Sequence, residues 1–159
     1  MRRDPAERMP DMTLPQGPER LLMFDISSRR YALRETSVAG LIECGHVRPV
    51  PGAPAAVVGL TDWRGHVMTL IDLHRVLDDT PERGPSCIVR LAAPLERAAL
   101  RVHSTLRLVE MRVAAIDAAG AECATPGVES RFEHDDRMVS LLDPQAIILH
   151  VAAQSGVHC

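Results

Sequence analysis

Short runs of alternating apolar and polar positions follow one another along most of this chain. In the first run, Leu22, Phe24 and Ile26 are separated by Met23 and Asp25. Successive side chains on a strand point to opposite faces, so this period of two predicts a half-buried strand. Comparable runs predict further strands at 31–33, 56–60, 67–71, 87–91, 98–102 and 138–142. The pattern therefore predicts a mainly β protein of short antiparallel strands.

One early segment follows a different period. Val38, Leu41 and Ile42 have the i, i+3, i+4 spacing of an amphipathic helix, and Thr36 or Ser37 could cap its start. A glycine inside this segment would weaken a helix by up to about 1 kcal/mol relative to alanine. We therefore expect a short helix around residues 38–42.

The most informative local unit spans residues 59–73. Two alternating arms flank Arg64 and Gly65, and a glycine at a hairpin tip can adopt a positive φ. Asp72 ends the second arm, where its carboxylate can accept hydrogen bonds from the free N–H groups of a helix that starts at Leu73. The unit is therefore expected to be a β-hairpin followed by an Asp-capped helical turn.

The second arm and its cap recur later in the chain. Residues 139–143 repeat the pattern of 68–72, and Asp143 is followed by Pro144, whose missing N–H costs nothing at the first position of a helix. A second hairpin is predicted around residues 134–136. Because Asp72 and Asp143 share one context, we interpret them as two helix caps rather than as an acid–base pair. The repeat predicts two similar lobes that close into small barrels.

The expected domain boundaries follow from composition. Four prolines interrupt residues 1–19, which we interpret as a flexible tail. The domain proper is expected at 20–150, with a first lobe at about 20–80 and a second at about 86–150, and a C-terminal tail at 151–159. Segments rich in proline, polar or small residues predict an irregular connector at 45–54, a linker at 78–85 and a long loop at 114–126.

Composition and charge exclude several classes of function. A net charge of −3 and only four aromatic residues give no electrostatic or stacking surface for nucleic acid or an anionic membrane. No apolar run approaches the roughly 20 residues that a membrane helix needs. The four cysteines contain no CxxC pair, which favours reduced thiols over a disulfide framework. These features predict a soluble, cytoplasmic protein.

Motifs for catalysis or cofactor binding are absent from the sequence. It has no nucleophile elbow, HExxH, phosphate loop or dinucleotide fingerprint. Cys44 and His46 are the nearest approach to zinc-ligand spacing, but no second pair of that kind exists. We therefore expect no enzyme activity, no cofactor and no metal.

Trp63 and Arg64 at the hairpin tip are the best candidates for a binding role. A half-exposed tryptophan can anchor an interface, but Trp63 could equally pack back on its own lobe. Arg64 could brace the turn by donating hydrogen bonds to backbone carbonyls, it could bind a carboxylate of a partner, or it could do both in sequence.

A set of segments between about residues 20 and 150 occurs in the order and at the spacings of a known family. They are 22–24 with 31–33, Val38 with Leu41, 51–54, 58–59, Arg64-Gly65 with 70–73, 136–138 and 141–143. In these segments the sequence resembles the CheW family of chemotaxis coupling proteins.

The resemblance implies two SH3-like, five-stranded β-barrel lobes packed together, with short helices. It also implies a non-catalytic adaptor of a two-component system. This adaptor would join the regulatory domain of a CheA-type histidine kinase to the cytoplasmic tip of a methyl-accepting chemoreceptor, in membrane-associated or soluble receptor arrays. Arg64 would lie at a receptor-facing groove between the lobes, and a receptor helix would lay an apolar stripe into that groove. The matching groove positions are Val38, Leu41, Gly59, Gly65, Thr105 and Leu108.

Two alternatives stay open at this stage. The chain could be a CheW-like scaffold of a pathway other than motility, with a different protein partner. It could also be a barrel that binds a small molecule or a metal through His66, His74 or His103.

Overall fold

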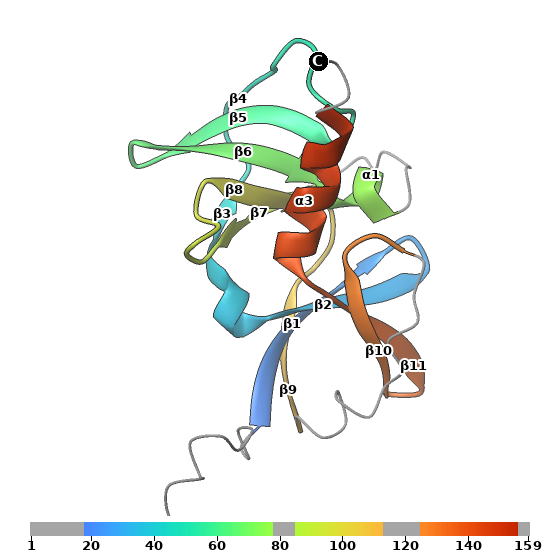
Figure 1. The fold of residues 1–159 in the computed structure, drawn as a ribbon. Helices are drawn as coiled ribbons and strands as arrows, with labels where there is room; N and C mark the ends of the chain where they lie inside the picture. The colour runs from blue at the N-terminus through green and yellow to red at the C-terminus, as the bar shows by residue number, and fades with distance from the viewer. Residues whose placement is uncertain (1–17, 78–84, 113–124, 156–159) are drawn as a thin grey trace, which may run out of the picture.

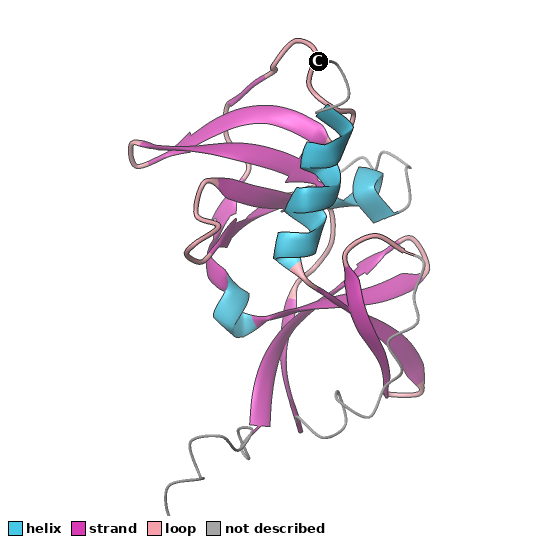
Figure 2. Cartoon of the chain, viewed as in Figure 1, coloured by secondary structure: helices cyan, strands magenta, loops and turns pink. Residues whose placement is uncertain are grey.

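The computed structural model describes residues 18–77, 85–112 and 125–155, and these form a mainly β structure with few helices (Figures 1 and 2). The elements in chain order are β1 (Pro18–Ile26), β2 (Arg29–Arg34), η2 (Glu35–Ser37), β3 (Val38–Glu43), β4 (Val47–Arg48), β5 (Val57–Trp63), β6 (His66–Asp72), α1 (Leu73–Leu77), β7 (Cys87–Leu91), β8 (Ala98–Val102), β9 (Arg107–Arg112), β10 (Val128–His134), β11 (Arg137–Leu142) and α3 (Pro144–Ser155).

The strands predicted from alternation are confirmed, but the expected helix around residues 38–42 is wrong. This segment is strand β3, preceded by one turn of 3-10 helix at η2. The pairing of β3 with β7 shifts between Val38 and Gly40, which marks a β-bulge. Burial alternates regularly along β3, with Val38 and Ile42 half-buried and Leu41 exposed. An apolar residue on the exposed face of the strand therefore imitates helical spacing.

The strands form two mixed sheets rather than purely antiparallel ones. Sheet A has the order β10-β11-β2-β1-β9, and sheet B has the order β3-β7-β8-β6-β5-β4. In sheet A, β11 pairs with β2 in parallel, and in sheet B, β6 pairs with β8 in parallel. All other ladders are antiparallel. Each sheet therefore joins two antiparallel units through one parallel ladder.

The two sheets do not coincide with the two halves of the sequence. The hairpin β1–β2 comes from the first half but lies in sheet A with β9, β10 and β11, while β7–β8 from the second half lies in sheet B. The chain is thus a duplication whose halves exchange their first hairpins. The expected lobes at 20–80 and 86–150 follow the repeat in the sequence, but each sheet draws strands from both repeats.

Three apolar clusters hold the sheets together. The largest contains residues from both sheets and from helices α1 and α3, among them Phe24, Leu100 and Ile147. Smaller clusters lie on the other face of each sheet, around Met23 in sheet A and around Met68 in sheet B. The alternation along β1 explains this division, because Leu22, Phe24 and Ile26 join the shared cluster, whereas Leu21 and Met23 join the smaller cluster of sheet A.

The expected boundaries change in a few places. Strand β1 begins two residues before the predicted start at 20, and helix α3 continues to Ser155 into the predicted C-terminal tail. Two residues of the predicted connector at 45–54 form β4, which gives sheet B a sixth strand where five were expected. Most of the N-terminal tail, the linker and the long loop fall outside the described residues. Closure of either lobe into a barrel stays a prediction, because the recorded ladders run in open order.

No helix in the described part of the chain is long and apolar enough to cross a membrane.

Candidate functional site

The β5–β6 hairpin has the geometry that its sequence predicts. Arg64 and Gly65 form a two-residue turn with φ values of +48° and +83°. Positive φ at both central positions defines the type I′ turn, whose twist matches that of the flanking strands. In Figure 1 the hairpin reaches away from the rest of the molecule, at the left of the view. Its tip is exposed from Arg64 to Val67.

Trp63 lies half-buried at the base of the tip and packs against the apolar interior of sheet B. The guanidinium carbon of Arg90 lies 3.6 Å from the centroid of its ring, and that of Arg64 lies 4.7 Å away. Both distances are within the range of a cation–π interaction. The prediction that Trp63 packs on its own lobe is therefore correct in part, since the ring also stays accessible.

Arg90 reaches this ring from the neighbouring strand pair. It lies on β7 opposite Gly40 of β3, and its Nη2 donates a hydrogen bond to the Ala39 carbonyl at 3.4 Å. A Cβ atom on Gly40 would lie 2.9 Å from the same nitrogen. Gly40 thus leaves room for the guanidinium, and the arginine holds Trp63 in place.

Arg64 does not brace the turn. None of the hydrogen bonds and ion pairs found among residues 18–77, 85–112 and 125–155 joins its guanidinium to a carbonyl or a carboxylate. It is exposed and lies near the Trp63 ring. Its charge is therefore available to a partner, which is the second of the two roles predicted for it.

A groove of about 770 Å³ runs between the hairpin tip and the β7–β8 turn. The β5–β6 side contributes Trp63, Gly65 and His66, and the opposite side contributes Arg90 and Arg97. The remaining lining residues are Ala39, Val67, Met68, Leu91, Ala93 and Glu96. An aromatic ring, two arginines and the exposed Val67 give this groove the composition of a protein-binding surface.

The other residues expected at a receptor groove are spread over both sheets. Leu41 is 47% exposed on β3 of sheet B, and Leu108 is 53% exposed on β9 of sheet A. Strands β7 and β1 are the first strands of the two repeats. Leu41 pairs with Val89 of β7 and Leu108 pairs with Leu22 of β1, so the two leucines have equivalent positions. Each therefore presents an apolar side chain on the edge strand of its sheet.

Three further predicted positions differ in their surroundings. Val38 packs against the shared apolar cluster, and Thr105 is exposed in the β8–β9 connection. Gly59 is buried, with φ at +151°, and a Cβ atom there would lie 2.2 Å from the carbonyl oxygen of Arg48. This glycine permits the close approach of β4, so its observed role is structural.

Asp72 and Asp143 act as the predicted caps. Asp72 Oδ1 accepts a hydrogen bond from the N–H of His74 at 2.9 Å, and Asp143 Oδ1 accepts one from Gln145 at 3.0 Å. Asp72 also makes an ion pair that the sequence analysis missed, with its Oδ2 2.6 Å from Nη2 of Arg101. Its side chain is only 1% exposed, so Asp72 joins β6, α1 and β8 in the interior.

The histidines in the described part of the chain do not assemble a metal site. Among the described residues, no group of three or more His, Cys, Asp or Glu side chains could hold a metal ion. His74 and His103 lie edge to face with centroids 5.3 Å apart, and the N–H of His103 donates a hydrogen bond to Nε2 of His74. These contacts tie α1 to the β8–β9 connection, whereas His66 lies at the exposed hairpin tip.

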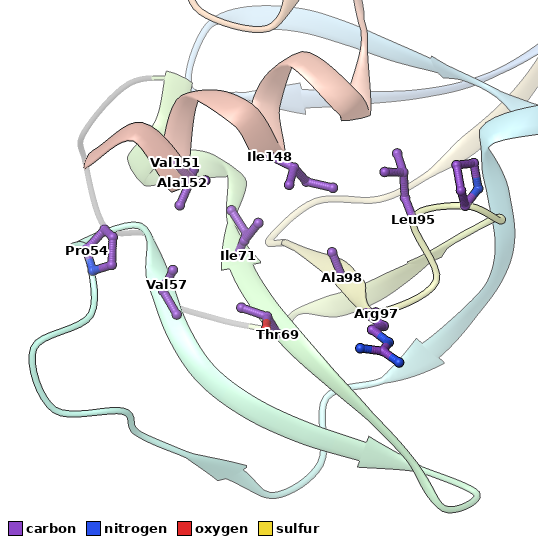
Figure 3. Close-up of a pocket in the computed structure, with 11 residues that line it drawn as sticks. Pro54, Val57, Thr69, Ile71, Leu95, Arg97, Ala98, Ile148, Val151 and Ala152 are labelled. Carbon is purple, nitrogen blue, oxygen red and sulfur yellow. The ribbon is translucent and has the colours of Figure 1, made fainter. Parts of the chain in front are cut away.

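A second cavity lies between sheet B and α3 (Figure 3). It has a volume of about 400 Å³, and Val57 and Ile71 of the sheet face Ile148 and Val151 of the helix across it. The lining is apolar apart from Thr69 and the charged Arg97. A cavity with so few polar groups offers nothing for acid–base or nucleophilic chemistry.

Arg90 and the Asp72–Arg101 pair are the main residues that sequence reasoning missed. Both depend on contacts between segments far apart in the chain. The one local signal was Gly40, a residue with no side chain in the middle of an apolar segment, which could have indicated a close approach by a neighbour.

The comparison with family models decides the family. A model of the CheW-like domain matches residues 20–152. The chain belongs to the CheW-like family. The structure is similar to a crystal structure of the scaffolding protein TtCheW from Thermoanaerobacter tengcongensis, with a TM-score of 0.71 and 18% sequence identity; the match covers 79% of this chain and 84% of that chain. At that identity the likeness shows the fold alone. No curated protein matches the sequence.

Membership of the CheW-like family confirms the resemblance found in the sequence and supports a chemotaxis-type scaffold or adaptor. The family is non-catalytic, which supports the prediction that this chain is not an enzyme. The partners of such a scaffold are proteins.

Proposed function

We propose that this CheW-like chain couples a CheA-type histidine kinase to the cytoplasmic tip of a chemoreceptor, at receptor arrays on the cytoplasmic side. The tip Trp63-Arg64-Gly65 carries this proposal. The half-buried Arg90 contacts the tryptophan ring, while Arg64 is exposed with its charge unpaired among the described residues. Fixed aromatic anchors beside an available arginine are typical of energetically important contacts in interfaces.

The receptor would bind as a helix along the exposed apolar residues. Leu41 and Leu108 lie on the edge strands of the two sheets, and Val67 near the tip is 59% exposed. A helix with an apolar stripe could cover such side chains while an acidic residue of the same helix meets Arg64. Single exposed apolar residues are ordinary, so it is their place on the two equivalent edges that supports this mode.

The kinase regulatory domain would bind through a lobe of this chain. Such a scaffold does no chemistry, and its effect is a population shift, in which its contacts favour one arrangement of the kinase over another. A partner from a pathway other than motility would use the same tip, so the choice between the two pathways lies with the kinase that is bound.

Reconstitution of a ternary complex tests the proposal. The full chain would be mixed with a CheA-type kinase and a chemoreceptor cytoplasmic fragment encoded beside it, and assembly measured by sedimentation and by kinase activity. We expect the receptor and the kinase to co-sediment only when the chain is present. If the chain binds neither protein, the proposal is wrong; if it binds a kinase but no chemoreceptor, the alternative scaffold is correct.

A further inference from the structure

A pocket of sheet A is lined by four arginines. It has a volume of about 370 Å³ and lies between the β1–β2 turn and the β10–β11 hairpin. Arg29 and Arg30 come from the turn side, and Arg131 and Arg137 come from the hairpin. The other lining residues are Ser28, Met138 and Ser140. This concentration of positive charge stands out in a chain whose net charge is −3.

Only part of this charge is neutralised by the protein. Arg30 is nearly buried, and its Nε donates a hydrogen bond to Asp25 at 2.9 Å. Arg137 donates a hydrogen bond to the Ser28 carbonyl at 3.2 Å and lies 3.9 Å from the same carboxylate. Arg29 and Arg131 are exposed and form no ion pair with the described residues. Among the described residues, Asp25 thus pairs with two of the four arginines, Arg30 and Arg137.

Two of these arginines, Arg30 and Arg137, act on Asp25. The hydrogen bond from Arg30 holds the pKa of this carboxyl below its usual value, and the charges of Arg137 and Arg107 act in the same direction against partial burial. A second anion placed beside these groups would be stabilised by the same charges.

The other sheet shows that the fold does not require Arg131 or Arg137. The ladders β10–β11 and β5–β6 have the same register, with Arg131 opposite Ser140 in sheet A and Leu60 opposite Thr69 in sheet B. His66 takes the place of Arg137 at the start of the second arm. The same backbone thus forms with an apolar or weakly basic residue where sheet A has an arginine. The fold therefore does not account for Arg131 and Arg137, whereas Arg30 has an arginine, Arg97, at the matching position before β8.

We propose that this arginine pocket binds a small molecule that carries a phosphoryl or pyrophosphoryl group. Guanidinium groups bind phosphate oxygens through paired N–H donors, and the hydroxyls of Ser28 and Ser140 add two further donors. A group with two or more negative charges balances the excess of arginine, whereas a single carboxylate would leave most of it uncompensated. The volume is at the lower end of small-molecule sites, which disfavours an extended peptide.

Titration of the full chain with inorganic pyrophosphate tests this site. We expect saturable binding with a Kd below about 1 mM at ~0.15 M salt, seen by calorimetry and by shifts of the amide resonances of Arg29, Arg131 and Ser140. The double variant Arg29→Gln/Arg131→Gln is expected to bind at least about tenfold more weakly. Both side chains are exposed, so its thermal unfolding should stay close to that of the wild type.

A matched control separates the pocket from charge in general. The variant Arg48→Gln/Arg75→Gln removes two exposed arginines from the β4 and α1 side of the molecule and should bind pyrophosphate as the wild type does. Acetate at equal ionic strength should cause no saturable shift. Equal weakening in both double variants, or no saturable binding by the wild type, would overturn the proposal. The titration needs neither kinase nor receptor, so its result is independent of the adaptor role.

Discussion

The hairpins β5–β6 and β10–β11 share one backbone arrangement, but the residues at their tips differ in chemical character. Each has a register shift near its start, between Val57 and Gly59 and between Val128 and Ser130. Each closes with two residues of positive φ, and each leads into an Asp-capped helix. The tips differ, because one reads Trp63-Arg64-Gly65 and the other reads His134-Asp135-Asp136.

This comparison separates scaffold from function inside one chain. Features present in both copies, such as bulge, turn and cap, are those that the fold needs. Features present in one copy only are candidates for binding. By this test Trp63 and Arg64 are specific to the β5–β6 hairpin, and Arg131 and Arg137 of the arginine pocket are specific to the β10–β11 hairpin. The predictions below compare matched positions of the two copies.

The largest difference in stability is expected between the two caps. Asp72→Ala removes a cap and leaves Arg101 without its buried partner, which should lower the free energy of unfolding by about 3–5 kcal/mol. Asp143→Ala removes only a half-exposed cap and should cost about 1 kcal/mol. Urea denaturation of both variants measures the two values. Equal losses would show that the Asp72–Arg101 pair adds nothing to the cap.

A smaller difference is expected at the two bulges. Gly59→Ala would place a Cβ atom against the Arg48 carbonyl at a positive φ and should cost about 2–3 kcal/mol. Ser130 has the matching position in β10, and Ser130→Ala should change stability by less than about 0.5 kcal/mol. Thermal unfolding of both variants gives the comparison. If Gly59→Ala leaves the stability unchanged, β4 does not approach Gly59 as closely as the structure shows.

The Trp63–Arg90 contact should contribute less to the free energy of unfolding than Asp72 or Gly59. A double-mutant cycle with Trp63→Leu and Arg90→Met should give a coupling energy of about 0.5–1 kcal/mol, as expected for a partly exposed cation–π pair. The matching cycle with Arg64→Met should give a smaller value, since this arginine is exposed and its guanidinium lies farther from the ring. A larger coupling energy of Trp63 with Arg64 than with Arg90 would contradict the view that Arg90 fixes the tryptophan.

The smallest effect concerns pH and Asp25. Its pKa is lowered in the folded state by the hydrogen bond from Arg30, so the ionised carboxylate stabilises the fold above the ordinary value of 3.8. This contribution is lost as the pH falls through the folded-state pKa. The stability difference between wild type and Asp25→Asn should therefore be largest near neutral pH and should shrink below 3.8 in acid denaturation.

An exposed carboxylate serves as the control for this experiment. Glu133→Gln changes the net charge by the same amount but removes no ion pair found among the described residues. It should have a smaller effect at neutral pH than Asp25→Asn. A difference for Asp25→Asn that does not depend on pH would contradict the assigned electrostatic role.

Local pattern predicted most strands, the hairpins and both caps, because alternation, turn chemistry and Asx capping act over a few residues. The strand β3 was wrongly predicted as a helix, since its exposed face carries the apolar Leu41, which completes a helical spacing with Val38 and Ile42. The exchange of first hairpins between the sheets could not be predicted. It depends on parallel ladders between distant strands, for which the sequence has no local signal.

The candidate site also divides into features that local sequence predicts and features that depend on distant contacts. The sequence indicated the tip Trp63-Arg64-Gly65 because turn residues and an isolated tryptophan are local features. Arg90, Arg101 and the arginine pocket were missed, since each depends on strands brought together by the fold. The duplication provides an internal comparison for the tip. The second hairpin has the same backbone but lacks the sequence Trp63-Arg64-Gly65, so these residues are not required by the fold.

Charge reversal at the two matched tips tests the central claim most directly. Arg64→Glu and Asp135→Lys alter equivalent turn positions, and co-sedimentation with the kinase and the receptor fragment would be measured for each. We expect Arg64→Glu to weaken receptor binding by at least about tenfold, as for loss of a charged interface contact, and Asp135→Lys to stay within about twofold of the wild type. Unchanged assembly for Arg64→Glu, or equal loss for both folded variants, would contradict the assignment of the partner contact to the β5–β6 tip.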